Sequence, residues 1–259
     1  RRSSDLQFVR IGSKEGDIAI VQDYVARPIK NLPEDFVLDG NVQLSGQPFF
    51  LAGQLMKKLP DLSKTICRGD CRCSANPFLQ TLKGLPKRII GDLSACICRT
   101  LKKLECKDTT VDGRRIELSD NNLVTADGLP KMTSPYCEIN LSKNKLSSWA
   151  GIPDRHQGFL DVSHNKYESF WGFPPHYQGS IDIKGNPLKS FEECPDTVHL
   201  IYCDEKQIPL VAKSASYIQE RVCCDAIIGE SDLGRNISFK RIPKQVIQNL
   251  ICKYNRQRG

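Results

Sequence analysis

The sequence has no long run of apolar residues. Hydrophobic residues make up 39% of the 259 residues, and no stretch approaches the roughly 18 apolar residues that a membrane-spanning helix requires. This absence predicts a protein without a membrane partner.

Signatures of catalysis are missing as well. The chain contains no G-x-S-x-G, no G-x4-G-K-[ST] and no H-E-x-x-H motif. Histidine occurs four times, and we expect His156, His164 and His176 at solvated turns, without a matching nucleophile and acid. The sequence therefore predicts a non-catalytic protein, not an enzyme, that uses no cofactor and no metal.

The sequence does contain a motif of 15 residues that is repeated four times. It reads IELSDNNLVTADGLP from Ile116, INLSKNKLSSWAGIP from Ile139, LDVSHNKYESFWGFP from Leu160 and IDIKGNPLKSFEECP from Ile181. Two aligned columns recur at intervals of 23, 21 and 21 residues: Asn121, Asn144, Asn165 and Asn186, and Pro130, Pro153, Pro174 and Pro195. A period in the low twenties with L-x-L-x-x-N-x-L predicts a leucine-rich-repeat solenoid.

The repeat continues in both directions, with less similarity to the motif in the outer units. Three upstream units match the four fixed positions of L-x-L-x-x-N-x-L less closely. Their residues at these positions are Leu93, Ala95, Cys98 and Thr100; Cys71, Cys73, Asn76 and Phe78; and Val42, Leu44, Gln47 and Phe49. The downstream unit contributes Ile201, Cys203, Lys206 and Ile208. We therefore expect about eight units over residues 33–210, between an N-terminal cap (1–32) and a C-terminal cap (211–259).

Each unit is expected to form one short strand with its apolar side chains facing inward. Parallel stacking of these strands, roughly 4.8 Å apart, would bury a core that one unit cannot bury alone. The Asn column should also face inward and satisfy backbone groups of the turn, because buried polar groups need partners. We assign this structural role to Asn76, Cys98, Asn121, Asn144, Asn165 and Asn186.

The outer part of each unit contains glycine and proline and is short. We expect turns and extended chain there, with little regular helix. A second row of core residues should stand before the prolines or at the matching place: Leu85, Cys106, Leu129, Ile152, Phe173 and Cys194.

The two ends of the chain predict different caps. Residues 1–32 alternate between apolar and polar, as in LQFVRI, and predict a β-rich cap. The segment KQVIQNLICKYNRQ predicts a C-terminal helix whose apolar face holds Val246, Ile247, Leu250, Ile251 and Tyr254.

The twelve cysteines are interpreted mainly as reduced core residues. Six fall on core columns: Cys71, Cys73, Cys98, Cys106, Cys194 and Cys203. The other six lie off these columns, and any disulfide should form among them: Cys67, Cys96, Cys137, Cys223, Cys224 and Cys252. A zinc site is the remaining alternative, but C-x-C is not the spacing of common zinc ribbons.

Charge is uneven along the chain. Residues 57–115 hold 14 Lys and Arg against 6 Asp and Glu, within a net charge of +7. The strand position between the core residues is nevertheless acidic or polar, and stacking would align it along the exposed concave face. This face is either a solvated surface or a docking site for a basic segment of another protein. The docking residues would be Glu117, Asn140, Asp161, Asp182, Phe159 and Tyr202, with Trp149 or Trp171 as further anchors.

Nucleic-acid binding is an alternative that the basic half supports. Its lysines and arginines, and the tail KYNRQR, would contact phosphates. Few aromatic residues are interleaved with these charges, and the central face is acidic. A protein partner is therefore the favoured interpretation.

The repeats LDVSHNKYESFWGFPPHYQGS and IDIKGNPLKSFEECP resemble the short leucine-rich repeats encoded by large tailed bacteriophages. In that family a strand ends in an Asn-rich turn, followed by Leu-x-x-Leu, Gly or Cys, and Pro. Matching positions here are Leu123, Leu146, Leu188 and Cys194-Pro195, and the resemblance covers roughly residues 33–210. It implies a virion component that binds neighbouring capsid, neck or tail subunits, or alternatively a host-takeover factor that binds a host protein in the infected cytoplasm.

A second resemblance is to the repeats of secreted bacterial ubiquitin-ligase effectors. Their catalytic domain uses a Cys-x-Asp nucleophile, and this chain contains Cys223-Cys224-Asp225. A tripeptide is too short to be specific, so this alternative carries little weight.

Overall fold

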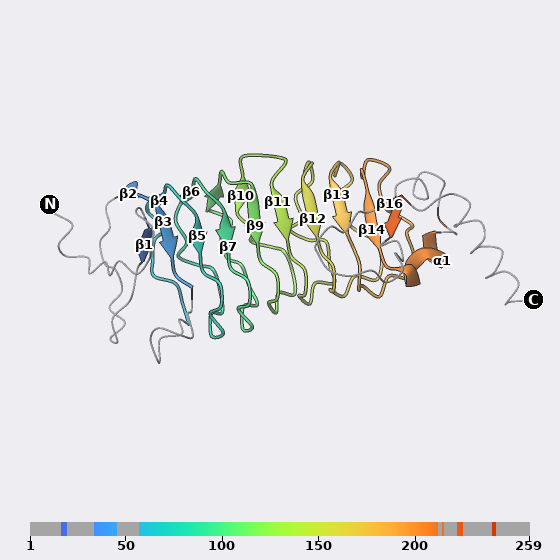
Figure 1. The fold of residues 1–259 in the computed structure, drawn as a ribbon, viewed down its shortest axis with the longest axis horizontal. Coiled ribbons are helices and arrows are strands. Elements are labelled where there is room, and N and C mark those ends of the chain that lie inside the picture. Colours follow the sequence, from blue (N-terminus) through green and yellow to red (C-terminus); the bar gives the residue numbers. More distant parts are fainter. Residues whose placement is uncertain are drawn as a thin grey trace, which may run out of the picture.

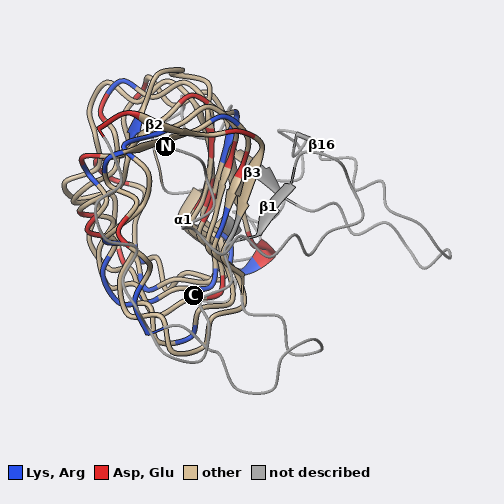
Figure 2. Cartoon of the chain, turned by 90° about the vertical axis from the view of Figure 1, so that its left-hand side faces the viewer, with Lys and Arg blue, Asp and Glu red and all other residues tan. Residues whose placement is uncertain are grey.

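The computed structural model describes residues 17–19, 34–45, 57–211, 214, 222–224 and 240–241. In these residues the chain winds into a β-solenoid whose turns lie side by side along the long axis (Figure 1). Parallel sheets form two sides of the solenoid, and Figure 2 shows β2 and β3 on different sides of the section. The predictions of stacked parallel strands and of little helix are confirmed.

The larger sheet has eleven short strands. All neighbouring pairs are parallel except the last, β15 with β16. In spatial order the strands are β1 (Asp17–Ala19), β3 (Asn41–Gln43), β5 (Cys71–Arg72), β7 (Leu93–Ser94), β9 (Arg115–Glu117), β11 (Glu138–Asn140), β12 (Phe159–Asp161), β13 (Ser180–Asp182), β14 (Ile201–Cys203), β15 (Val222–Cys224) and β16 (Lys240–Arg241).

The register of this sheet follows the alignment of the repeats. One core position is occupied on successive strands by Val42, Cys71, Leu93, Ile116, Ile139, Leu160, Ile181 and Ile201. All eight are buried. Val222 continues the row on β15, within the stretch where the sequence pattern loses its period.

A second, five-stranded parallel sheet was not predicted. It occupies part of the outer segments, where we expected only turns and extended chain. Its strands are β2 (Phe36–Leu38), β4 (Thr65–Cys67), β6 (Arg88–Ile89), β8 (Thr110–Val111) and β10 (Lys131–Met132). After β10 the corresponding segments, which begin at Pro153, Pro174 and Pro195, form turns instead.

The described residues contain very little helix. A 3-10 turn covers Glu205–Gln207, and α1 spans Ile208–Val211. The predicted C-terminal helix and most of residues 1–32 lie outside the described residues. Of the predicted β-rich cap, only β1 is described. No helix in the described part of the chain is long and apolar enough to cross a membrane.

Two units depart from the predicted columns by one residue. Phe78 and Thr100 were expected in the core, but Phe78 is 48% exposed and Thr100 is half-buried. Leu79 and Leu101 are fully buried in their place. The residues of the Asn column, including Cys98, are named the ladder here. These two units carry one more residue between the ladder position and the next core side chain than the later units do.

Two backbone positions in six successive turns adopt a left-handed conformation. The first directly precedes the ladder residue, at Ala75, Ile97, Asp120, Lys143, His164 and Gly185. The second stands before the second core row, at Gly84, Glu105, Gly128, Gly151, Gly172 and Glu193. These six turns therefore bend sharply at the same two places, whatever residue stands there.

Candidate partner-binding face

The six residues expected to bind a partner all lie on the outward face of the eleven-stranded sheet. The parallel register joins five of them into one line, named here the central row: Glu117, Asn140, Asp161, Asp182 and Tyr202. Phe159 lies two residues before Asp161 on β12 and faces the same side, because side chains alternate along a strand. The structure therefore gathers these residues on one surface.

The polar side chains of the central row bind the turn that follows their own strand. Each accepts the backbone N–H two residues further on: Glu117 from Ser119 (3.1 Å), Asn140 from Ser142 (3.0 Å), Asp161 from Ser163 (2.9 Å) and Asp182 from Lys184 (2.9 Å). These side chains therefore have a structural role in addition to any role in binding.

Neighbouring cations reduce the negative charge that the sequence led us to expect on this face. The Arg115 guanidinium lies 2.7 Å from the carboxylate of Glu117 and 3.4 Å from that of Glu138. The Lys184 ammonium lies 3.3 Å from Asp182. Basic and acidic residues are also intermingled around the section of the solenoid in Figure 2.

An aromatic pair covers the C-terminal part of the face. The rings of Phe159 and Tyr202 meet edge to face, with 5.8 Å between their centroids, although they belong to β12 and β14. They therefore reach across β13, which carries Asp182. The Asp182 side chain is buried, with 8% of the residue exposed.

The position of Asp182 changes its acidity. Burial, with a smaller contribution from the negative charge of Asp161, raises the pKa of Asp182 from 3.8 to about 6. The backbone N–H and the ammonium group of Lys184 oppose this shift. A carboxylate with this pKa gains and loses its charge close to neutral pH.

The two tryptophans are not anchors on this face. Trp149 is buried in the core and stacks on Tyr167, with 3.8 Å between ring centroids. Trp171 is 76% exposed, but it stands beside Gly172 at the bend of the outer segment. Both were placed wrongly by sequence alone, because a tryptophan in the outer segment can occupy either a core or a surface position.

The ladder residues lie inside the solenoid. Asn121, Asn144, Asn165 and Asn186 each donate to a carbonyl in their own turn and to one in the preceding turn, as Asn144 does to Leu141 and Leu118 (both 3.0 Å). Their side-chain oxygens accept an N–H from the preceding turn. Asn76 donates in the same way to Leu44 and Cys73. The ladder thus links adjacent turns through buried amide groups.

Cys98 occupies the same ladder with a thiol. Its sulfur lies 3.4 Å from the carbonyl oxygen of Cys73 in the preceding turn and 3.6 Å from that of Cys96. At the C-terminal end of the ladder, Gln207 donates to the carbonyl of Asn186 (3.2 Å).

Seven cysteines of the repeats are free thiols, and all except Cys96 are buried: Cys67, Cys71, Cys73, Cys96, Cys98, Cys106 and Cys137. Cys67 and Cys137 were expected off the core, but they are 0% and 1% exposed. Both belong to the inner surface beneath the second sheet and its connections, which the sequence did not reveal. Burial raises the pKa of Cys67 and of Cys137 to about 12, so these thiols are poor nucleophiles.

One histidine also differs from expectation. His156 is not solvated but buried, with 2% exposed, and its ring lies 5.7 Å from that of Tyr177. Burial lowers the pKa of His156 to about 4, against a weaker opposing effect from a hydrogen bond with the Cys137 backbone. Among the described residues, no group of three or more His, Cys, Asp or Glu side chains is arranged to hold a metal ion.

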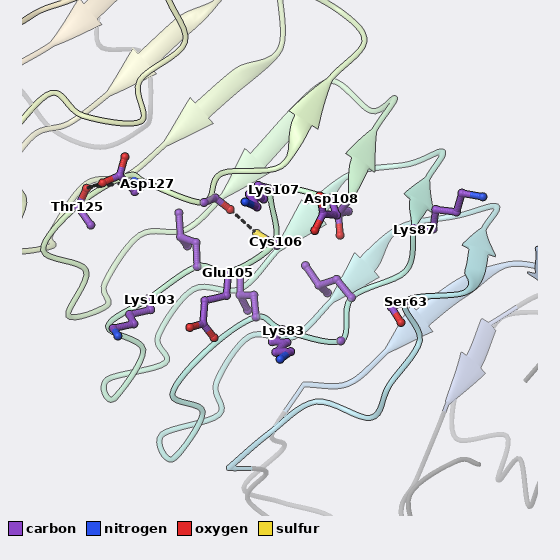
Figure 3. A pocket seen from close by; sticks show the side chains of 16 residues that line it. Ser63, Lys83, Lys87, Lys103, Glu105, Cys106, Lys107, Asp108, Thr125 and Asp127 are labelled. Carbon is purple, nitrogen blue, oxygen red and sulfur yellow. Dashed lines mark hydrogen bonds between the residues drawn. The ribbon is translucent and has the colours of Figure 1, made fainter. Parts of the chain in front are cut away.

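Sequence reasoning missed a hollow on the outer side of the solenoid. It has a volume of about 640 Å³ and is lined by residues from four successive turns, among them Lys83, Lys103, Lys107 and Asp127 (Figure 3). The sequence does contain a feature that could have indicated it. The segment from Leu104 to Cys106 is one residue shorter than the corresponding segments of the neighbouring repeats.

Comparison with known proteins gives no family for this chain. No protein-family model matches it, and no curated protein or solved structure is significantly similar to it.

Proposed function

We propose that this chain is a non-catalytic scaffold of the leucine-rich-repeat type that binds another protein through the outward face of its eleven-stranded sheet. The repeat pattern and the buried Asn ladder support the assignment to leucine-rich repeats. A solenoid of this kind offers an extended surface for a partner.

The observation that carries the proposal is the Phe159–Tyr202 pair above Asp182. Two half-exposed aromatic rings beside carboxylates provide apolar contact and charge on a face built of rigid strands. Asp161 extends the acidic surface next to the rings, whereas the charge of Glu138 is partly offset by Arg115. A basic segment of a partner protein would complement this surface.

The resemblance of the repeats to those of tailed bacteriophages supports a place in the virion. In this proposal the chain holds neighbouring capsid, neck or tail subunits together. Quantitative mass spectrometry of purified particles tests it. Peptides from this chain in stoichiometric amounts are expected, and their absence would contradict the virion role and favour a host-directed role in the infected cytoplasm.

The face itself is tested with a variant that combines Asp161→Lys and Tyr202→Ala. We expect this variant to fold but to lose incorporation into particles, because it reverses one charge and removes one aromatic contact. Trp171→Ala is the matched control, since it removes an exposed aromatic ring from the outer side. Equal incorporation of both variants would exclude the sheet face as the contact surface.

A further inference from the structure

The hollow on the outer side arises from a difference in chain length. In six turns, two buried side chains of the outer corner are three residues apart: Leu59 and Leu62, Leu82 and Leu85, Ala126 and Leu129, Trp149 and Ile152, Phe170 and Phe173, and Phe191 and Cys194. In the remaining turn, Leu104 and Cys106 are only two residues apart. The hollow lies at this short corner and is lined by residues of the turns on both sides of it.

The neighbouring corners form the walls of the hollow. Lys83 projects from the corner before it and Asp127 from the corner after it, while Lys103 and Lys107 flank the short corner itself (Figure 3). The buried side chains of Leu82, Leu85, Leu104 and Cys106 lie beneath the chain at the base. Most of the lining is carbon, and it includes the aliphatic stems of the lysines.

The charged groups around the hollow are not equally available. The carboxylate of Glu105 accepts the hydroxyl of Thr81 (2.7 Å), and that of Asp127 accepts the hydroxyl of Thr125 (3.0 Å). Within the described residues, Lys83, Lys103 and Lys107 form no ion pair, whereas Lys87 pairs with Asp35. Three ammonium groups without an ion pair therefore border a hollow of small-molecule size with a largely apolar lining. The carboxylates of Glu105, Asp108 and Asp127 border it as well, so its four lysines and three acids give the lining a net charge of +1.

We propose that this hollow binds a small amphipathic anion, in which an apolar ring or chain carries a carboxylate or sulfonate group. The apolar part would lie against the lysine stems and the base, and the anionic group would pair with the ammonium groups of Lys83, Lys103 and Lys107. This site is separate from the sheet face proposed to bind a protein, because it lies on the outer segments.

The test is a fluorescence titration of the full chain with 8-anilinonaphthalene-1-sulfonate. We expect one site per chain, weakened by salt. N-phenyl-1-naphthylamine has the same rings without the sulfonate and should bind at least about tenfold more weakly. Insertion of a glycine between Glu105 and Cys106 gives this corner the length of its neighbours. It should fill the hollow and lower the affinity for the sulfonate probe by at least about tenfold.

Three matched variants complete the test. Glu193→Gly also places glycine at a left-handed corner, but in a corner of full length, and should bind the probe as the unmodified chain does. Lys103→Gln combined with Lys107→Gln should weaken binding by about fivefold, whereas Lys145→Gln combined with Lys166→Gln should not. Circular dichroism verifies that each variant is folded. Unchanged binding by the insertion variant, or equally tight binding of the neutral probe, would overturn the proposal.

Discussion

The backbone N–H of Leu123 donates to the side-chain oxygen of Asn144, which lies 3.0 Å away in the following turn. The amide nitrogen of the same side chain donates to Leu118 and Leu141. One buried asparagine therefore binds four backbone groups that belong to two turns, since its amide nitrogen also reaches the Ser142 carbonyl oxygen (3.2 Å). The carbonyls of Leu118 and Leu141 also accept from Asn121 and Asn165, whereas the Leu123 N–H depends on Asn144.

We expect Asn144→Ala to lower the free energy of unfolding by about 3 kcal/mol, because it leaves the buried N–H of Leu123 without its partner and removes one of two amide donors from the carbonyls of Leu118 and Leu141. Chemical denaturation measures this loss. Asn122→Ala is the control, since the Asn122 amide binds the carbonyl of Arg99 at the exposed surface. A similar loss in both variants would mean that the ladder contributes no more than an ordinary surface hydrogen bond.

Ile97 stands at a left-handed position with a φ of 60°, where a β-branched side chain is strained. The equivalent position in a later turn is Gly185. We expect Ile97→Gly to raise the melting temperature, with a gain of about 1 kcal/mol in the free energy of unfolding. Ile90→Gly is the control, because Ile90 is similarly exposed but is not in the left-handed region. If both substitutions destabilise the protein, the strain at Ile97 is negligible.

Strands β3 to β14 of the larger sheet could be predicted from sequence because each presents the same short pattern of inward side chains, whereas β15 and β16 lie where this pattern is lost. Ile116, Ile139 and Leu160 are interchangeable in packing, so the period is visible. The second sheet could not be predicted in this way. Its strands have two or three residues each, and the side chain in the aligned inward position varies among Leu38, Cys67, Ile89, Val111 and Met132.

Single side chains were misplaced where residue type and position conflict. His156 is polar, so it was expected in solvent, yet Tyr177 and Val198 stand at the same distance after a proline and are buried too. Phe78 is apolar, but an additional residue turns it outward. The central row shows a further limit, because the sequence cannot reveal that Phe159 and Tyr202 meet above β13.

Two buried tyrosines allow a comparison of how a bonded and an unbonded hydroxyl group affect the free energy of unfolding. The hydroxyl of Tyr177 lies 3.0 Å from the Gly158 carbonyl oxygen and 3.2 Å from that of Ser180, whereas the hydroxyl of Tyr167 has no partner among the described residues. We expect Tyr177→Phe to cost about 1 kcal/mol and Tyr167→Phe to stabilise the fold by about 1 kcal/mol. Thermal unfolding of the two variants measures the difference. Destabilisation by Tyr167→Phe would imply a bonded hydroxyl.

Burial of neutral His156 should make stability depend on pH. The folded-state pKa of about 4 lies below the usual 6.5, so the unfolded chain binds the proton more readily between these values. Stability is therefore fully present above pH 6.5 and decreases as the pH falls towards 4, by up to about 3 kcal/mol.

The pH dependence is measured by denaturation of the unmodified chain and of His156→Leu at pH 7 and pH 4.5. The apolar variant should lose less stability on acidification, because it has no imidazole to charge. His176→Gln removes an exposed histidine and should behave as the unmodified chain does. Identical losses in all three proteins would show that His156 does not titrate in this range.

The raised pKa of Asp182 gives the opposite pH dependence. Its folded-state pKa of about 6 exceeds the usual 3.8, so the folded chain holds this proton more tightly than the unfolded chain does. The cost of the buried charge is fully present above pH 6 and disappears as the pH falls below 3.8. Asp182→Asn keeps an oxygen that can accept the Lys184 N–H, as Asn140 accepts that of Ser142.

Asp182→Asn should therefore stabilise the protein by about 1 kcal/mol at pH 7, since removal of the buried charge outweighs the lost ion pair with Lys184. The gain should shrink towards zero at pH 4, where Asp182 is already protonated. Asn140→Asp provides the reverse change, because it places a carboxylate between Glu117 and Asp161 in the central row and should destabilise the protein at pH 7. A gain from Asp182→Asn that is equal at both pH values would contradict the raised pKa, because an uncharged and a charged carboxyl group cannot cost the same when buried beneath Phe159 and Tyr202.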